Sequence, residues 1–332
     1  MKIHLTGTNW HGDITSNLQK AFESLGHKVF FFEKHLSRGW KIAQNLITRA
    51  SRKPYDAENY FSDIATKRWR QSVASFQPDL VIVEDAPNIR IGLEGFPIFY
   101  YEVSPPHGSG AKEVLLSFRY VDEVFCIDKD WAKYIEMFFS EKVRHLPLAG
   151  NPDVFYPMDI DKIYDVVMVA SAPEQSPDGL MRAKLIDSIP GNLRVEVFGN
   201  GWKYWFRYFP RLEFRYGGYP KTAKEVNRIY NQSKIVLNFH STGHISSVSS
   251  RTFEIALASA FLITAQRRAL SFFPDFPDFV GINDMNAQIS EWLPKDKARQ
   301  EVSQRMRNEV LQRHTWNHRA EEILKVFNEK YK

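Results

Sequence analysis

Residues 233–264 read SKIVLNFHSTGHISSVSSRTFEIALASAFLIT, and this stretch is the most informative one for the fold. It predicts a buried strand, a loop rich in serine, a short helix at 251–260 and a second buried strand. Two buried strands joined by a helix are typical of a parallel sheet. A loop that opens onto a helix N-terminus beside strand ends is where such a sheet holds a phosphorylated ligand.

The same alternation of strands and helices extends along the rest of the chain. A strand at 2–7 precedes a helix whose apolar residues recur at helical spacing. The run HKVFFFE at 27–33 predicts a strand covered on both faces. Further buried runs predict strands at 79–85, 96–102, 123–128, 142–148, 165–171 and 194–201. We therefore expect an α/β protein with doubly wound parallel sheets.

The chain has 332 residues, which is more than one hydrophobic core usually serves, so two domains are expected. The stretch GNPDVFYPM at 150–158 holds two prolines and shows no periodicity, and we place the boundary there. This gives a first domain over 1–150, a second over 158–314 and a last helix over 315–332. Two such lobes imply a cleft between them.

The composition narrows the class of protein only slightly. The net charge of +5 mildly favours anionic partners such as nucleotides, nucleic acid or a phospholipid surface. The single cysteine, Cys126, can form no intrachain disulfide and lies in an apolar run, so we expect a buried thiol in a reducing compartment. No run approaches the ~18 apolar residues of a membrane span, and no signal peptide precedes the first strand, so we expect a cytoplasmic protein.

Two segments mix cations with aromatic side chains and leave two interpretations open. Residues 35–76 are helical and basic, which fits either a solvated helix face or a surface for an anionic acceptor or a membrane. Residues 202–219, WKYWFRYFPRLEFRYGGY, fit either a core-packing strand with arginines reaching water or a contact with a membrane interface, bases or sugars. Peripheral membrane contact is therefore an expectation, without an integral segment.

A family resemblance rests on six motifs that follow one another along residues 121–327: LPLAGNPDVFYP, YDVVMVAS, VFGNGW, EVNRIYNQSKIVLNFH, SSRTFEIALASAFLIT and HTWNHRAEEIL. In order and spacing they resemble the group 1 glycosyltransferases, in the CgeB-like, spore-maturation branch. The resemblance implies a GT-B fold, with two facing Rossmann-like domains. It further implies that the second domain holds a nucleotide-sugar donor, that the first takes the acceptor, and that the last helix crosses back to the first domain.

The resemblance also assigns the donor nucleotide to particular residues. Glu254 is expected to hydrogen-bond the ribose, since a carboxylate accepts from two vicinal hydroxyls, although a glutamate there also complements a helix dipole. The Gly-x-Gly-Trp loop formed by Gly199, Asn200, Gly201 and Trp202 is expected near the nucleotide, with a plain turn as the alternative. Ser246 stands eight positions before Glu254, where the family has a first glutamate that helps to position the donor sugar.

Candidate phosphate ligands lie around the same loop. Arg251 enters the helix three residues before Glu254 and is expected to pair with the diphosphate or to form a structural ion pair. Ser249 and Ser250 are expected to donate to phosphate oxygens, Ser250 being equally suited as an N-cap. Arg182, after the strand at 165–171, is a further phosphate candidate. No metal motif is present, so we expect a metal-independent site without a cofactor.

On the first domain, His107 follows a strand end and is expected to contact the transferred sugar, because related enzymes place a histidine there. Asp13 is a candidate general base and equally a helix N-cap. We therefore expect a glycosyltransferase that moves a sugar from a nucleotide-sugar to an acceptor hydroxyl, with retention. The alternatives are a non-catalytic nucleotide- or sugar-binding or structural protein of the same fold, and a DNA-modifying glycosyltransferase. The acceptor, whether glycan, lipid, protein or nucleic acid, stays open.

Overall fold

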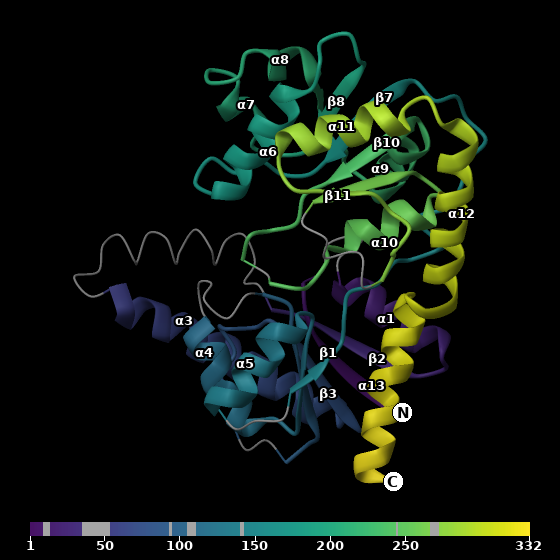
Figure 1. Ribbon diagram of the computed structural model, residues 1–332. Helices are drawn as coiled ribbons and strands as arrows, with labels where there is room; N and C mark the ends of the chain where they lie inside the picture. Colours follow the sequence, from purple (N-terminus) through teal and green to yellow (C-terminus); the bar gives the residue numbers. More distant parts are fainter. Residues whose placement is uncertain are drawn as a thin grey trace. The chain divides into compact units, whose positions relative to one another are not determined.

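The computed structural model describes residues 1–8, 14–34, 54–92, 95–104, 111–139, 143–243, 245–265 and 272–332, without the side chains of 54–60, 111 and 139. The chain divides into two compact units (Figure 1). The first unit comprises Met1–Pro147 together with Ala320–Lys332, and the second unit comprises Leu148–Arg319. The last helix therefore begins in the second unit and ends in the first.

The first unit is built on a six-stranded parallel sheet in the order β2-β1-β3-β4-β5-β6. Its strands are β1 (Lys2–Gly7), β2 (Lys28–Glu33), β3 (Leu80–Glu84), β4 (Ile98–Glu102), β5 (Glu123–Cys126) and β6 (Val143–His145). Its helices are α1 (Ile14–Ser24), α3 (Pro54–Phe76), α4 (Ala111–Ser117), the 3₁₀ turn η1 (Phe118–Tyr120), α5 (Lys129–Phe139) and most of α13 (Trp316–Tyr331). All residues of β3 and β4 are buried, as expected for strands covered on both faces.

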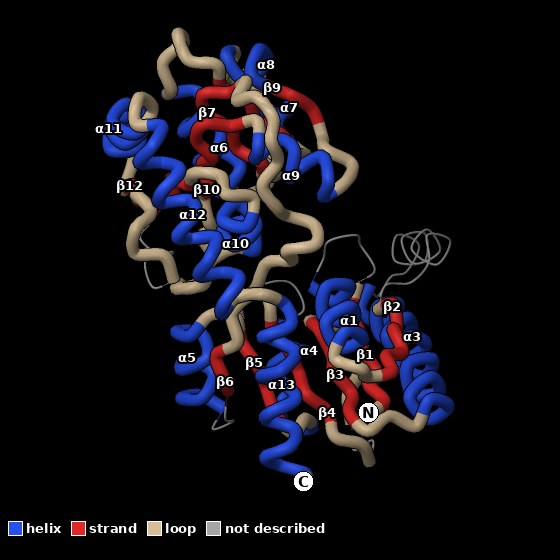
Figure 2. Tube along the Cα trace, turned by 90° about the vertical axis from the view of Figure 1, so that its right-hand side faces the viewer, coloured by secondary structure: helices blue, strands red, loops and turns tan. Residues whose placement is uncertain are grey.

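Two groups of helices cover the two faces of this sheet. One core cluster joins Trp69 of α3, Phe118 of η1 and Ile135 of α5 to strand residues such as Tyr100. The opposite face is covered by α1 and α13, and Phe327 of α13 lies 6.3 Å from Phe99 of β4 between ring centroids. Figure 2 shows α13 running along that face of the sheet. We call the side that carries α3, α4 and α5 the outer helical face.

The second unit has its own six-stranded parallel sheet, in the order β12-β11-β10-β7-β8-β9. Its strands are β7 (Tyr164–Val169), β8 (Val195–Phe198), β9 (Tyr216–Gly218), β10 (Ser233–Asn238), β11 (Leu262–Ala265) and β12 (Asp278–Phe279). Its helices are α6 (Pro177–Ser188), α7 (Trp202–Trp205), α8 (Arg211–Arg215), α9 (Ala223–Asn231), α10 (Ser250–Leu257), α11 (Ile282–Trp292) and α12 (Asp296–Arg313). Helices α6 and α11 pack together on one face, while α9, α10 and α12 cover the other.

Each sheet has a topological switch point. There the chain adds strands first on one side of a strand and later on the opposite side of the same strand. In the second unit the strand order reverses between β7 and β10, which pair in parallel. In the first unit it reverses between β1 and β3. Open α/β sheets bind ligands outside the carboxyl ends of the strands at such points. These two edges are therefore where functional side chains are expected.

Two expectations from the sequence were wrong. The strand at 27–33 is not covered on both faces, because β2 forms the edge of the sheet and leaves Phe30 38% exposed. The strand alternative for 202–219 was wrong for most of that segment, because 202–205 and 211–215 form the helices α7 and α8, and only 216–218 forms a strand, β9. Cys126 is buried, and burial raises the pKa of its thiol to about 12, as fits an inert core residue.

Candidate functional site

The candidate site lies at the carboxyl ends of β7 and β10 in the second unit. The side chain of Asn238, the last residue of β10, donates to the hydroxyls of Ser249 (3.1 Å) and Thr252 (3.0 Å). These bonds hold the start of α10 against the end of β10. Ser249, not Ser250, is the N-cap residue, and its hydroxyl makes no capping bond to the helix. The Ser249 hydroxyl therefore leaves the backbone N–H groups at the start of α10 to other partners.

His240 fixes the same loop from the other side. Its Nε2 lies 2.9 Å from the Thr264 hydroxyl at the end of β11, and its Nδ1 accepts from the backbone N–H of Ser249. The ring is buried. His240 thus has a structural hydrogen-bonding role, which orients the entry to α10.

Arg182 of α6 bridges the two strand ends at the switch point. Its Nη atoms donate to the carbonyl oxygens of Ser171 (2.6 Å) and Phe239 (3.2 Å), which follow β7 and β10. Asp178 lies one turn earlier, with an oxygen 3.8 Å from the guanidinium, and accepts from the backbone and hydroxyl of Thr242. Partial burial opposes ionisation of Asp178, but these hydrogen bonds and the Arg182 charge hold its pKa below the ordinary value.

Glu254 and Arg251 project from the first turns of α10 into the same environment. Burial raises the pKa of Glu254, while the Arg251 charge and a hydrogen bond from Ser250 oppose that rise. Burial lowers the pKa of the Arg182 guanidinium, and the nearby charge of Arg251 lowers it further. The hydroxyl of Tyr230, on α9, is buried without a hydrogen-bond partner among the described residues, and Glu254 adds to the rise in its pKa. Two arginines and one glutamate therefore share this edge of the sheet.

The Gly-x-Gly-Trp loop forms the neighbouring part of the edge, after β8. A Cβ at Gly199 would lie 2.2 Å from the carbonyl oxygen of Ala170, and one at Gly201 would lie 2.4 Å from that of Ala172. Both glycines have positive φ, 136° and 84°. Trp202 is fully buried and donates its indole N–H to Ala170, whereas Asn200 is exposed. The loop is locked against the segment that follows β7, and Trp202 contributes by holding it there.

The first unit carries a second polar cluster, at the carboxyl ends of β3 and β4. Lys34 donates to the Glu84 carboxylate at 2.8 Å, and both side chains are 7% exposed. Asp85 has a left-handed φ of 37° and accepts from the Ser104 hydroxyl. Glu102 accepts from the Ser104 N–H, but its Oε2 is buried without a partner among the described residues. Burial and the charge of Asp85 raise the pKa of Glu102 well above its ordinary value.

The predicted residues fall into two groups. Arg182, Arg251, Glu254 and the loops at 199–202 and 249–250 all lie around the carboxyl edge of the second sheet. His107 and Asp13 lie outside the described residues, so their assignments stay predictions. The sequence-based prediction missed Asp178 and Tyr230 in the second unit, and Asp85 and Glu102 in the first. The carboxylates that end the runs DLVIVED and FPIFYYE were the available signal for the first-unit pair.

Two further properties bear on function. No group of three or more His, Cys, Asp or Glu side chains within the described ranges is arranged to hold a metal ion. None of the described helices combines the length and apolar character needed to cross a bilayer.

Residues 181–325 match a family model described as glycosyl transferase-like. No curated protein matches the chain. Among solved structures, the N-terminal domain of Candida albicans trehalose-6-phosphate phosphatase matches with a TM-score of 0.69 at 9% identity, over 99% of this chain and 97% of that one. Anabaena HepE, in complex with UDP-glucose, matches with a TM-score of 0.68 at 11% identity, over 99% and 100%. AviGT4, a glycosyltransferase of avilamycin A biosynthesis, matches with a TM-score of 0.60 at 12% identity, over 98% and 96%.

These findings confirm the predicted fold class. Two six-stranded parallel sheets with flanking helices match the GT-B architecture of known glycosyltransferases. The glycosyltransferase-like domain covers the candidate site from Arg182 through Glu254. Together the domain and the fold support the prediction of a glycosyltransferase enzyme. The CgeB-like branch stays a prediction.

Proposed function

We propose that the protein transfers a sugar from a nucleotide-sugar to an acceptor hydroxyl and holds the donor nucleotide at the carboxyl edge of the second sheet. The observation that carries this proposal is the grouping of Arg182, Arg251 and Glu254 at the switch point between β7 and β10. Such edges are the ligand sites of open α/β sheets. The family match includes all three residues, and HepE, a structural neighbour, was solved with UDP and with UDP-glucose.

In this proposal each residue has a distinct role. The Glu254 carboxylate accepts from the ribose hydroxyls of the donor. Arg251 and the N-terminus of α10, which the Ser249 hydroxyl does not cap, receive the diphosphate and stabilise the charge that develops on it as the leaving group departs. Arg182 already uses two Nη atoms on backbone carbonyls, so it positions the loops after β7 and β10 and adds positive potential.

We further propose that the reaction needs no metal ion and retains the anomeric configuration of the donor. Two arginines near the diphosphate supply the positive charge that a metal would otherwise provide. Unchanged turnover in excess EDTA would support the first statement, and strong inhibition that Mg²⁺ or Mn²⁺ reverses would contradict it. The anomeric configuration of the product, read by NMR, decides between retention and inversion.

The first unit is proposed to supply the acceptor side. Its carboxyl edge contains Glu102, whose buried Oε2 has no partner within the described part of the chain, and the charge of Asp85 acts on it, so this edge can hold or exchange a proton. His107 and Asp13 stay candidates for contact with the sugar and for the general base. The acceptor class stays open among glycan, lipid, protein and nucleic acid.

A thermal-shift panel of nucleoside diphosphates and their sugar conjugates tests the proposal. A ligand that binds only the folded protein raises its melting temperature by mass action, so the panel identifies the base and the sugar. Donor hydrolysis or transfer by the purified protein, lost in Glu254→Ala, would establish the enzyme. If no nucleotide or nucleotide-sugar shifts the melting temperature and none is consumed, the proposal is wrong.

Ser246 favours one alternative, a protein that binds a nucleotide-sugar without turning it over, because the family's first glutamate is absent there. A clear thermal shift with no hydrolysis or transfer across a broad acceptor panel would identify that case. A DNA-modifying enzyme would instead show duplex binding that weakens steeply with salt.

A further inference from the structure

The outer helical face of the first unit exposes a row of large apolar side chains on α5. The rings of Trp131, Tyr134 and Phe138 contact one another in succession along the helix, with centroids 5.5 Å and 4.7 Å apart. Tyr134 is 49% exposed, Phe138 62% and the adjacent Met137 68%. One exposed apolar side chain is ordinary, but a contiguous row on one helix marks an interaction surface.

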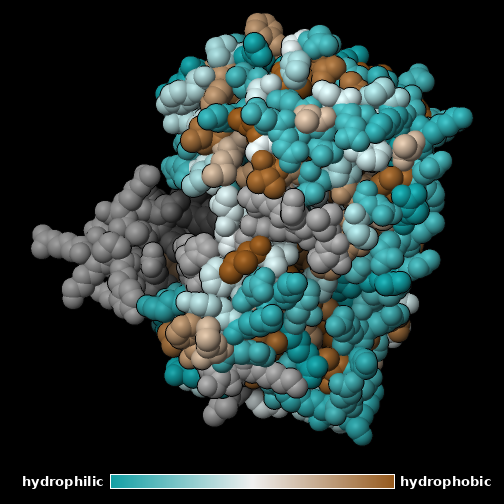
Figure 3. Space-filling view, viewed as in Figure 1, coloured by the Kyte–Doolittle hydropathy of each residue, from teal (hydrophilic) through white to brown (hydrophobic). Residues whose placement is uncertain are grey.

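This row is continuous with the rest of the outer helical face. Trp131 of α5, Leu115 of α4 and Tyr120 of η1 pack against the same core cluster, so the three elements lie side by side over one layer. Leu116 of α4 is 48% exposed. Figure 3 shows hydrophobic atoms at the surface in the region of α4 and α5.

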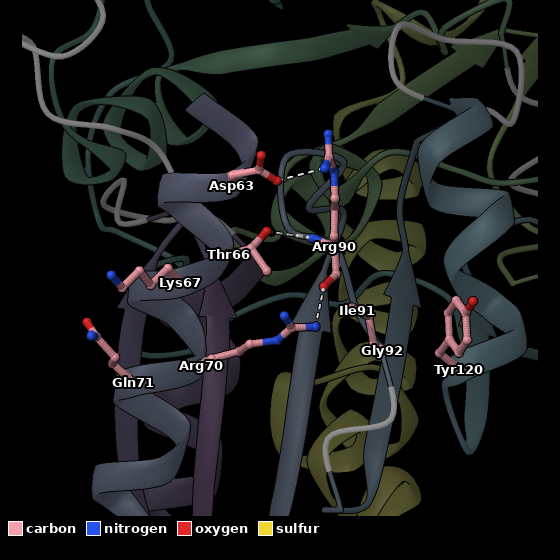
Figure 4. A pocket seen from close by; sticks show the side chains of 9 residues that line it. All are labelled: Asp63, Thr66, Lys67, Arg70, Gln71, Arg90, Ile91, Gly92 and Tyr120. Carbon is pink, nitrogen blue, oxygen red and sulfur yellow. Dashed lines mark hydrogen bonds and ion pairs between the residues drawn. The ribbon is translucent and has the colours of Figure 1, made fainter. Parts of the chain in front are cut away.

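The same face contains a basic pocket of about 820 Å³ between α3 and η1. Its described lining residues include the cations Lys67, Arg70 and Arg90 and the carboxylate of Asp63. Asp63 accepts from Arg90 at 2.7 Å, and Arg90 and Asp63 remain 50% and 63% exposed. Figure 4 shows α3 on one side of the pocket, Tyr120 on the other, and the segment from Arg90 to Gly92 between them.

Hydrogen bonds join the two walls of the pocket. The backbone N–H of Arg90 donates to the Thr66 hydroxyl at 2.9 Å, which ties the segment after β3 to α3. Arg70 donates to the carbonyl oxygen of Arg90. Cations outnumber carboxylates among the described lining residues, and Lys67 is exposed, which suits a phosphate group.

We propose that the outer helical face docks on the surface of a bilayer that contains anionic phospholipid. The phosphate of one headgroup enters the basic pocket, and Tyr134, Met137 and Phe138 enter the boundary between headgroups and acyl chains. Aromatic residues with one apolar and one polar end suit that depth, and cations beside them strengthen binding to anionic lipid. This inference does not depend on the proposed activity.

Charge complementarity favours a lipid surface over a protein partner. Lys129 and Lys133 are exposed on α5, beside the apolar row. The acidic residues of that helix are Asp130 and Glu136, and the Glu136 carboxylate accepts from the backbone N–H of Val143. Snorkelling lysines around an apolar row, together with a separate phosphate-sized basic pocket, match the layered chemistry of an anionic membrane.

Co-sedimentation of the full chain with vesicles tests the proposal. We expect binding to phosphatidylcholine vesicles that contain phosphatidylglycerol, and much weaker binding to phosphatidylcholine alone. Met137→Ser combined with Phe138→Ser should weaken binding about tenfold or more. Lys67→Glu should weaken it by about fivefold or more. The matched controls Val280→Ser and Lys184→Glu alter a 67% exposed apolar side chain and an exposed lysine in the second unit and should leave binding unchanged.

Three outcomes would overturn the proposal. Binding that is equal with and without phosphatidylglycerol would remove the role of the basic pocket. A thermal shift with inorganic phosphate or pyrophosphate, lost in Lys67→Glu, without any vesicle binding would assign the pocket to a soluble anion. Self-association in sedimentation velocity that the double serine variant abolishes, without vesicle binding, would assign the apolar row to a second copy of the chain. The altered side chains are exposed, so unchanged melting temperatures will show that the variants fold.

Discussion

Replacing Glu254 by glutamine should separate stability from ligand binding. The substitution keeps the shape of the side chain and removes a carboxylate whose pKa is raised by burial and which lies near Tyr230. A glutamate with a raised folded pKa adds stability that is complete below its unfolded value of about 4.5 and is lost as pH rises through the folded pKa. At neutral pH the charged group is therefore unfavourable, and the ligand-free glutamine variant should be at least as stable as the wild type. Near pH 4 the two should converge.

The expected effect on the nucleotide has the opposite sign. Hydrogen bonds to a charged group contribute about 1.5–3 kcal/mol, so losing them should weaken nucleoside diphosphate binding roughly tenfold to a hundredfold. At a ligand concentration of about 100 times Kd, the wild type gains about 2.7 kcal/mol. With a hundredfold weaker Kd at that concentration, the variant would gain only about 0.4 kcal/mol.

Thermal unfolding with and without the nucleotide identified by the panel measures both effects. Glu301→Gln, at an exposed position of α12, is the matched control and should change neither quantity. A lower ligand-free melting temperature in Glu254→Gln with an unchanged nucleotide shift would refute the reasoning. It would assign Glu254 to the structure of α10 instead of the ligand.

Three other perturbations test the surrounding structure. Lys34→Met should lower the free energy of unfolding by about 3–5 kcal/mol in chemical denaturation, because it removes the ion-pair partner of the buried Glu84 carboxylate. Adding Glu84→Gln should restore part of the loss, and an unaffected single variant would contradict the buried ion pair. Gly199→Ala should lower the melting temperature and weaken the nucleotide response because its Cβ would meet a carbonyl oxygen, whereas Gly191→Ala, with open space around it, should do neither. Burial lowers the pKa of His4 to about 4, so the stability that is complete above its unfolded pKa of 6.5 is lost as pH falls toward 4, by at most about 3 kcal/mol. His4→Asn should therefore flatten the melting-temperature profile between these two pH values. An unchanged profile would show that His4 does not cause the loss of stability.

The strands that form the two sheet centres could be predicted from the sequence because their burial is nearly complete. The expected strand at 2–7 is β1 without any change, and the run at 234–240 contains most of β10. Such strands read as continuous apolar runs whatever their neighbours are. The run at 27–33 looks equally apolar, but its place at the sheet edge depends on which strand pairs with it, and that is a property of the whole fold.

The site was predictable in part for a similar reason. Glu254 and Arg251 are three positions apart on one helix, so local spacing already places them together. Arg182 contacts the carbonyl of Phe239, 57 positions away, and Tyr230 meets Glu254 only because α9 and α10 cover the same face of the sheet. No local pattern shows such pairings. The sequence suggested Arg182 only as a phosphate ligand. The structure shows in addition that Arg182 donates to two loop carbonyl oxygens.

The charges at this edge also give a consequence to the serine at position 246. Asp178 lies 3.8 Å from Arg182, and Glu254 is close enough to Arg251 for their charges to interact, so each carboxylate at this edge already has an arginine nearby. A glutamate at 246 would have added a negative charge to this loop, and a serine does not. This edge should therefore distinguish among ligands mainly by their diphosphate. The increase in melting temperature should grow steeply from nucleoside to monophosphate to diphosphate and change little when the sugar is added. Selection among sugars must then come from other residues, and the panel that identifies the nucleotide will show whether the conjugates differ from one another.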